Sequence, residues 1–342
     1  MVNLGIIGCG KITKIRHAKE LFECENAGVA GFYDISKDRA KELVDEFGGK
    51  VYDDYQDMLR DPEVDGVIIC TPNSTHAQMS IEAMQQGKHV LVEKPMATTL
   101  EDSERIIKEA EKSDKIIMAA HNQRFTYAHS RAKEIISRGE MGRVLSFRCT
   151  LAHPGPEYFS VGGAGTWYLD KKASGYGCIS DLGIHRLDII MYVLGEKISK
   201  ISGFARTLDK KKEDGTLAEV YDNSVSILSM ESGAIGTLNL SYTNYGDWDN
   251  SLVLYCEKGV IKTHFYNDCD IEIVMKDGRR IKENQPPYVG EKPNSNIIRN
   301  FVKAIEDGGE SPVSAKDAYM AMKAIVAIDK SEKTKQCIEI WG

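Results

Sequence analysis

Short apolar runs alternate with amphipathic segments along the first third of the chain. The apolar runs occupy residues 2–7, 28–33, 64–70, 89–92 and 115–120. Between them lie segments whose apolar residues recur at helical spacing, such as 36–47, 75–86 and 100–112. Because strands that alternate with helices of about 10–15 residues form βαβ units, this pattern predicts a parallel sheet.

The pattern changes after residue 124. Helices are predicted at 126–138, 295–306 and 315–331. Longer strands with hairpin spacing are predicted at 144–152, 198–208, 220–229, 234–242, 251–257, 259–265 and 270–275. Strands joined by short glycine-containing turns pair antiparallel, so a largely antiparallel sheet is expected in this part of the chain.

Composition narrows the class of protein. The 342 residues leave room for about two domains. The net charge of −7 argues against nucleic acid or an anionic membrane as a partner. No apolar run approaches the roughly 20 residues of a membrane span, and the N-terminus lacks the regions of a signal peptide. A cytoplasmic protein with no membrane partner is therefore expected.

The most basic stretch is residues 210–212, which are all lysine and are followed by Glu213, Asp214 and Gly215. Opposite charges next to a glycine are typical of a hairpin tip in water. We therefore expect residues 210–212 to be solvated and to carry no function.

Metal binding is not expected. The eight cysteines include no C-x-x-C pair and show no zinc-finger spacing. Several lie inside apolar strand patterns, as Cys70 does, and should be small buried residues.

A glycine-rich turn follows the first predicted strand and precedes a helix. Residues 8–13 read Gly-Cys-Gly-Lys-Ile-Thr, which is a G-x-G-x-x-G pattern with Thr13 in the third place. In this context Gly8 permits a tight turn, and Gly10 lets backbone amides approach a pyrophosphate at the helix N-terminus. The incomplete pattern is weak evidence by itself.

Asp34 follows the second predicted strand, at the usual distance from such glycines for a carboxylate that binds an adenosine ribose. It would accept hydrogen bonds from both ribose hydroxyls and repel a 2′-phosphate, which favours NAD over NADP. Lys37 and Arg39 could still tolerate a phosphate. Alternatively, Asp34 is only an N-cap for the next helix.

Polar residues follow several of the predicted strands directly. In a parallel sheet these positions project from one edge, where open α/β sheets bind ligands. The residues concerned are Gly8, Asp34, Thr71-Pro72-Asn73, Glu93-Lys94 and His121-Asn122-Gln123-Arg124. A shared edge is stronger evidence than any one motif.

Lys94 has two interpretations. Alone, it is a surface lysine in a strand-to-helix loop; at the shared edge, it lines a ligand site. The following residue is Pro95, and a peptide bond before proline can be cis at modest cost. We predict a cis bond that aims Lys94 into the site.

The second part of the chain supplies a histidine among carboxylates. Read as a helix, Asp181, His185, Asp188 and Tyr192 form one polar face, opposite an apolar side. Carboxylates on both sides would orient the histidine and keep it available as a proton acceptor. Alternatively, the histidine merely bonds to its neighbours, or the Asp/His pair helps to hold a metal, although no third ligand is evident.

A glycine-rich loop with aromatic residues precedes this helix. Residues 162–170 contain three glycines together with Trp167 and Tyr168. Such a loop suits the wall of a polyol pocket, where the apolar face of a sugar stacks on a ring. The alternative is a mobile surface loop with Trp167 as its anchor.

Several motifs occur together in one order. They are the glycine loop, Thr71-Pro72-Asn73 with His76, Glu93-Lys94-Pro95, Asn122-x-Arg124-Phe125 and Asp181-x-Gly183-x-His185-x-x-Asp188. In this combination the chain resembles the Gfo/Idh/MocA oxidoreductases over essentially its whole length. The resemblance implies an α/β protein. An N-terminal Rossmann domain with a doubly wound parallel sheet (1–123) would precede a C-terminal α+β domain (124–342). That domain would hold a large, mostly antiparallel open sheet that binds substrate and forms oligomers.

The resemblance also implies roles for individual residues. The catalytic residues would be Lys94, Asp181 and His185, and substrate would also contact Arg124 and Trp167. The cofactor would contact Gly8, Gly10, Lys11, Ile12, Asp34, Thr71, Pro72, Asn73, His76, Glu93, Lys94 and Asn122. Many members of the family form dimers or tetramers, so a homodimer or homotetramer through the C-terminal sheet is expected.

The expected reaction is NAD-dependent oxidation of a secondary alcohol of a sugar, glycoside or inositol-type polyol. His185 is the expected general base, because a reference pKa of about 6.5 suits this work. Lys94 would orient the hydroxyl or share the proton. Two alternatives remain at this stage: a redox-neutral enzyme that recycles tightly bound NAD to cleave or isomerise a sugar, and a non-catalytic NAD-sensing regulator.

Overall fold

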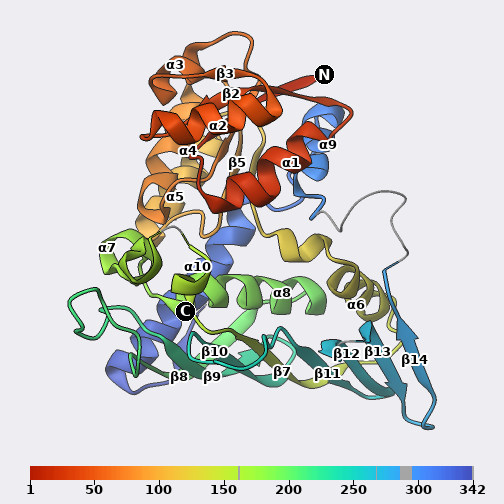
Figure 1. Ribbon diagram of the computed structural model, residues 1–342. Helices are drawn as coiled ribbons and strands as arrows, with labels where there is room; N and C mark the ends of the chain where they lie inside the picture. Colours follow the sequence, from red (N-terminus) through yellow and green to blue (C-terminus); the bar gives the residue numbers. More distant parts are fainter. Residues whose placement is uncertain (161, 267, 286–294, 341–342) are drawn as a thin grey trace. The chain divides into compact units, whose positions relative to one another are not determined.

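The computed structural model describes residues 1–160, 162–266, 268–285 and 295–340. It divides into two compact units (Figure 1). Unit 1 comprises Met1–Asn122 and Pro293–Tyr319, and unit 2 comprises Gln123–Lys292 and Met320–Gly342. Helix α9 (Ile297–Asp307) lies beyond the boundary predicted at residue 123 but belongs to unit 1, because its buried side chains pack against α1 and β1.

Unit 1 contains a parallel six-stranded sheet in the order β3-β2-β1-β4-β5-β6. Its strands are β1 (Val2–Ile7), β2 (Ala27–Tyr33), β3 (Lys50–Val51), β4 (Gly66–Ile69), β5 (His89–Val92) and β6 (Ile117–Ala119). The central strands are buried on both faces, which explains their continuous apolar runs. This strand order confirms the predicted doubly wound Rossmann fold.

The helices of unit 1 form two groups. Helix α1 contacts α2 and α9, and α4 contacts α5. Right-handed crossovers place such groups on opposite faces of a doubly wound sheet. The helices are α1 (Ala18–Phe22), which continues a π-helical turn (Thr13–His17), α2 (Lys37–Phe47), α3 (Tyr55–Arg60), α4 (His76–Gln85) and α5 (Leu100–Ala110).

Unit 2 contains a nine-stranded sheet in the order β14-β13-β12-β11-β7-β10-β9-β8-β15. Among its described pairs, β10 and β7 are parallel and the others antiparallel, which confirms the predicted mostly antiparallel sheet. The strands are β7 (Val144–Ala152), β8 (Ile198–Arg206), β9 (Asn223–Met230), β10 (Ile235–Ser241), β11 (Leu252–Cys256), β12 (Gly259–Tyr266), β13 (Cys269–Met275), β14 (Arg280–Glu283) and β15 (Ile338–Glu339). The edge strands β14 and β15 are absent from the sequence-based prediction.

Helices cover one face of this sheet. Helix α6 (Tyr127–Ser137) packs on β12 and β13, and α8 (Ile184–Leu194) packs on β7 (Figure 1). A short helix α7 (Lys171–Ser174) precedes α8, and α10 (Ala315–Thr334) contains the boundary between the two units. Side chains that alternate along β9 and β10 point inward and outward in turn.

Candidate functional site

The strands of unit 1 end level with one another. Tyr33, Ile7, Ile69, Val92 and Ala119 are paired in register and form one row across the sheet. All these strands are parallel, so the residues that follow the row share one edge. Eight predicted cofactor residues lie within three positions of the row: Gly8, Gly10, Asp34, Thr71, Pro72, Glu93, Lys94 and Asn122. The shared edge predicted from the sequence is confirmed.

The glycine turn is built for close approach of a ligand to the backbone. Gly8 has a φ of 98°, and a Cβ there would lie 2.7 Å from the backbone of Cys70. Nothing lies within 4 Å of the position that a Cβ on Gly10 would occupy, so this position is open. Thr13 is buried, and its hydroxyl donates to the Gly8 carbonyl at 2.6 Å. Thr13 therefore fastens the turn where the usual pattern has a glycine, and the turn fits a dinucleotide.

Asp34 is held at the edge by the glycine turn. Its Oδ2 accepts a hydrogen bond from the Cys9 amide at 2.7 Å, and its Oδ1 accepts from the Ser36 amide at 2.8 Å. The Arg39 guanidinium also donates to Oδ1, at 2.7 Å. Since each carboxylate oxygen accepts about two hydrogen bonds, Oδ2 has capacity for one more. The described contacts thus leave room for one ribose hydroxyl, where two were expected.

His76 ties two loops of this edge together. One ring nitrogen lies 2.8 Å from the Thr71 carbonyl oxygen and the other lies 2.8 Å from that of Pro95. The ring is buried, and burial lowers its pKa. These contacts make His76 a residue that positions the loops after β4 and β5. Its direct contact with a cofactor stays a prediction.

A buried ion pair supports the segment that carries Lys94. Glu93 Oε1 lies 2.6 Å from His17 Nε2, and Glu93 Oε2 accepts a hydrogen bond from the Lys94 amide at 3.0 Å. The Lys94–Pro95 peptide bond is cis, as predicted. Burial alone would raise the pKa of Glu93, but His17 and Lys94 lower it to about 2. Burial alone would lower the pKa of His17, but Cys70 and Glu93 raise it to about 10.

Sequence reasoning missed His17. It lies on the helix side of the glycine turn, four positions after Thr13 and therefore on the same helix face. A histidine at that spacing was a usable signal for an inward-facing residue. Its partner is 76 positions away, so the pair itself could not be read from the sequence.

The His17–Glu93 pair makes the stability of unit 1 depend on pH. Glu93 has a folded pKa below its ordinary value of 4.5, so its contribution is lost as pH falls from 4.5 toward about 2. His17 has a folded pKa above its ordinary value of 6.5, so its contribution is complete below 6.5 and is lost as pH rises toward about 10. We expect the melting temperature to decline above pH 6.5, partly because of this pair.

A His17→Gln variant should melt at a lower temperature at pH 6, because breaking a buried pair costs about 3–5 kcal/mol. The difference from the unmodified protein should shrink as pH rises to 10. Thermal unfolding followed by circular dichroism between pH 5 and 10 measures both effects. His89→Gln is the control, since His89 is half-buried and begins β5 at the other end of the strand. An equal slope of melting temperature against pH in His17→Gln and the unmodified protein would count against the charged pair.

In unit 2, the segment around Asp181 and His185 is not one amphipathic helix. A π-helical turn (Ile179–Gly183) precedes α8 and shifts the angular spacing of the side chains. Between residues 181 and 190, every residue except His185 is buried. The segment is therefore buried on its polar as well as its apolar side, and the grouping of Asp181 with His185 on one face stays a prediction. Its polar groups lie inside the protein because they find partners there.

Asp181 is held by a tyrosine that the sequence did not reveal. The hydroxyl of Tyr242 donates to Asp181 Oδ2 at 2.9 Å, and the tyrosine is fully buried. Burial and the nearby Asp181 carboxylate raise the pKa of Tyr242 well above its ordinary value, so the hydroxyl keeps its proton. Tyr242 therefore orients the Asp181 carboxylate. It follows β10, 61 positions from Asp181.

Arg124 is engaged by the second carboxylate of the motif. Its Nε donates to Asp188 Oδ2 at 2.9 Å and its Nη2 donates to Oδ1 at 2.5 Å. Both side chains are buried, and the Arg124 guanidinium lies 5.1 Å from the Tyr192 ring centre. This bidentate pair fixes the start of α6 to α8. A contact between Arg124 and substrate stays a prediction.

Aromatic rings extend from Asp181 to Trp167. Tyr242 lies 5.4 Å from His153, which lies 5.3 Å from Phe159. Phe159 lies 6.1 Å from Tyr168, which stacks on Trp167 at 4.0 Å. Trp167 is therefore anchored to its neighbour and belongs to a continuous aromatic wall. Its role in binding the apolar face of a sugar stays a prediction.

The structure thus gathers the predicted residues in two sets. Unit 1 holds the glycine turn, Asp34, His76, Glu93, Lys94 and Asn122 at one sheet edge. Unit 2 holds Arg124, Asp181 and His185 at or beside α8, and Trp167 in the turn before α7. Which of them touch a cofactor or substrate stays a prediction. Within the described residues, no group of three or more His, Cys, Asp or Glu could hold a metal ion. In the same part of the chain, no helix has the length and apolar character needed to cross a membrane.

Comparison with known proteins matches both units. Residues 2–121 match the family model of GFO_IDH_MocA, an oxidoreductase family with an NAD-binding Rossmann fold, and residues 129–262 match its C-terminal domain. The chain is 34% identical to levoglucosan dehydrogenase of Pseudarthrobacter phenanthrenivorans, over 84% of this chain and 83% of that protein. It is 27% identical to myo-inositol 2-dehydrogenase of Thermotoga maritima, over 99% and 98% of the two chains. A levoglucosan dehydrogenase structure in complex with NADH has the same fold, with a TM-score of 0.88 and 24% identity over 99% of each chain.

Proposed function

The chain belongs to the Gfo/Idh/MocA family of oxidoreductases, and from this premise we propose that it oxidises a secondary alcohol of a sugar, glycoside or inositol-type polyol. It is an NAD-dependent enzyme, since its N-terminal unit is the NAD-binding Rossmann domain of the family. Bound NAD⁺ would supply the hydride acceptor. The names of the relatives, which are dehydrogenases of levoglucosan and inositols, favour this reaction over the redox-neutral and regulatory alternatives.

The observation that carries the proposal is the position of Lys94. It follows β5 at the same sheet edge as Gly8 and Asp34, so a residue whose amine could take part in proton transfer belongs to the edge that carries the glycine turn. Its backbone is fixed by Glu93, which is itself fixed by His17.

We assign three roles in the chemistry. His185 accepts the proton of the substrate hydroxyl, Lys94 orients that hydroxyl, and Asp181 binds a neighbouring hydroxyl. Tyr242 supports this by holding the Asp181 carboxylate in one orientation. Trp167 provides a ring for the apolar face of the sugar, and Arg124 supports α8 through Asp188.

A substrate panel tests the proposed function. Sugars, glycosides and inositols are incubated with the purified protein and NAD⁺, and NADH is followed by absorbance. We expect NADH to accumulate with at least one compound. Turnover of substrate without NADH would instead support the redox-neutral alternative, and no redox activity across a broad panel would support a regulator.

We propose that NAD is preferred over NADP because of Asp34. The two nearby cations are already paired, Arg39 with Asp34 and Lys37 with Asp53, so neither is available for a 2′-phosphate without losing its partner. We expect kcat/KM to be at least about tenfold higher with NAD, given the strength of hydrogen bonds to a charged group. Equal kcat/KM values with the two cofactors would refute this role of Asp34, and Asp34→Ala should abolish the preference.

We also propose that a second copy of the chain covers the open face of the unit 2 sheet. This face carries apolar side chains that are more than half exposed: Phe204 (65%), Val225 (55%), Ile227 (61%) and Ile235 (57%). Phe204 pairs with Val225 across β8 and β9, and alternation places Ile227 on the same face. Contiguous exposed apolar patches of this kind mark association surfaces.

A cytoplasmic location, expected from the sequence, stays a prediction.

An Ile227→Glu variant should reduce the oligomer to a single chain, because a charge in an apolar interface loses its hydration. Size-exclusion chromatography with light scattering measures the mass. The control is Leu217→Glu, which places the same charge on an exposed apolar residue outside this sheet. If the unmodified protein is already a single chain, or Ile227→Glu leaves the oligomer intact, this surface is not the interface.

A further inference from the structure

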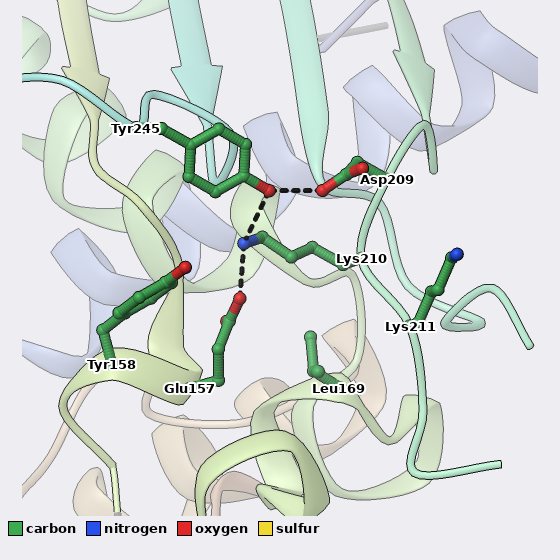
Figure 2. Close-up of a pocket in the computed structure, with 7 residues that line it drawn as sticks. All are labelled: Glu157, Tyr158, Leu169, Asp209, Lys210, Lys211 and Tyr245. Atoms are coloured by element: carbon green, nitrogen blue, oxygen red, sulfur yellow. Dashed lines mark hydrogen bonds and ion pairs between the residues drawn. The ribbon is translucent and has the colours of Figure 1, made fainter. Parts of the chain in front are cut away.

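A cavity of about 310 Å³ lies in unit 2 around Lys210 (Figure 2). Lys210 belongs to the basic run that was expected to be a solvated hairpin tip. The hairpin is present, because Lys211 and Leu217 form an antiparallel β-bridge. The Lys210 side chain, however, is only 3% exposed. The expectation that residues 210–212 are solvated is therefore wrong for Lys210. The cavity is lined by Glu157, Tyr158, Leu169, Asp209, Lys210 and Tyr245, with Lys211 at its rim.

The Lys210 amine is fully occupied within the protein. It donates to the Glu157 carboxylate, to the Pro154 carbonyl oxygen and, at 3.2 Å, to the Tyr245 hydroxyl. An ammonium group has three protons to donate, so none is left over. Burial alone would lower the pKa of Lys210, but its bonds to Glu157 and Tyr245 raise it, so the amine stays charged. Lys210 therefore stabilises the cavity wall, and its amine has no proton left with which to bind an anion.

Lys210 Nζ lies 5.5 Å from the ring centre of Tyr158 and 4.7 Å from that of Tyr245. The groups left for a ligand are therefore the ring faces turned away from Lys210 and hydrogen-bonding groups of both signs. Tyr158 is 68% exposed and Tyr245 is 55% exposed, and Leu169 supplies a buried apolar contact. Tyr245 donates to Asp209, so its ring is held in place (Figure 2). The two carboxylates and two amines of the cavity balance in charge. A neutral ring with an apolar face and many hydroxyls fits this lining, since a cation would compete with Lys210 for Glu157 and an anion would meet the carboxylates of Glu157 and Asp209.

The cavity shares a loop with the Asp181 end of the aromatic wall. His153 packs 5.4 Å from Tyr242, whose hydroxyl holds Asp181, and its Nδ1 accepts a hydrogen bond from the Gly155 amide at 3.0 Å. The next residue, Pro154, offers its carbonyl oxygen to Lys210. Residues 153–158 thus contact the support of Asp181 at one end and line the cavity at the other. Leu169, which also lines the cavity, lies in the same helical turn as Trp167.

We propose that this cavity is a second sugar subsite, which binds the neutral glycosyl unit attached to the ring that is oxidised. The inference rests on the proposed function and narrows its substrate class from free sugars and inositols to glycosides of two or more sugar units. Tyr158 is the principal stacking surface, and Asp209 and Lys211 bond to hydroxyl groups. The cavity volume lies at the lower end of the range for small-molecule sites.

The kinetic test compares neutral disaccharides, such as maltose, cellobiose and sucrose, with their monosaccharides. The unmodified protein should show the higher kcat/KM with a disaccharide. Tyr158→Ala should lower kcat/KM for that disaccharide by about tenfold or more, and by less than about threefold for the monosaccharide, since one aromatic contact is lost. Leu208→Ala is the control. Leu208 is 65% exposed and lies close to Lys210 in the sequence, but its side chain does not line the cavity.

A binding measurement separates failure of the subsite from failure of the proposed function. Saturation-transfer NMR with the same disaccharides, without NAD⁺, should show contact with the unmodified protein and a loss of signal with Tyr158→Ala. If no sugar is oxidised but this loss is seen, the reaction is wrong and the subsite stands. If Tyr158→Ala leaves the disaccharide signal unchanged, or affects disaccharide and monosaccharide turnover alike, the subsite is overturned.

Discussion

Replacing His185 by alanine is expected to lower kcat by about two to four orders of magnitude, the range typical of a lost general base. The residue is the one partly exposed position in the otherwise buried run 181–190, so its ring is open to a ligand on at least one side. Removing the ring should leave the fold intact. Steady-state kinetics with the best substrate of the panel, together with the melting temperature, measures both consequences.

Two additions make the His185 experiment decisive. Added imidazole should restore part of the turnover of His185→Ala, because it replaces the missing base. His89→Ala is the matched control, since His89 begins β5 and its Nδ1 accepts a hydrogen bond from the Ile116 amide; its kcat should stay within about threefold. Near-normal turnover in His185→Ala would remove this residue from the mechanism.

Replacing Lys94 by methionine should lower kcat by a comparable factor, about two to four orders of magnitude. Methionine keeps most of the length of the side chain, but it removes the positive charge and the N–H donors. The segment should keep its conformation, because Glu93 binds the Lys94 backbone amide and not the side chain in this contact. The affinity for NAD⁺, measured by calorimetry, should change by less than about tenfold, so that the loss falls on kcat.

Lys115→Met is the control for Lys94. Lys115 lies just before β6, at the other end of the strands, and pairs with the exposed Asp114. Its removal should leave kcat and NAD⁺ affinity within about twofold, as for most surface substitutions. If Lys94→Met turns over normally, or loses activity only because NAD⁺ no longer binds, then Lys94 does not take part in the chemistry.

The part of the fold that follows from apolar patterning was predictable from the sequence. Continuous apolar runs predicted parallel strands buried on both faces, and the residues after each run therefore had to share an edge. The structure agrees with this expectation, because Ile7, Ile69 and Val92 pair in register at the ends of their strands. For the same reason, the sequence alone predicts that Gly8 and Asp34 share an edge with Lys94.

Partners of buried polar groups could not be predicted. Tyr242 is 61 positions from Asp181, His17 is 76 positions from Glu93 and Glu157 is 53 positions from Lys210. When the partner of a polar residue is that distant in the sequence, the pair cannot be recognised, and the residue is predicted to be exposed to solvent. This is why the helix of His185 was expected to have a polar face and Lys210 was expected to lie in water.

The most direct test of the central claim is the stoichiometry of NADH formation. With the best substrate of the panel and excess NAD⁺, the oxidised product is quantified by chromatography while NADH is followed by absorbance. The proposed dehydrogenase forms one NADH for each molecule of substrate oxidised, and this formation is lost in both His185→Ala and Lys94→Met. Product formed without an equivalent amount of NADH would contradict the account.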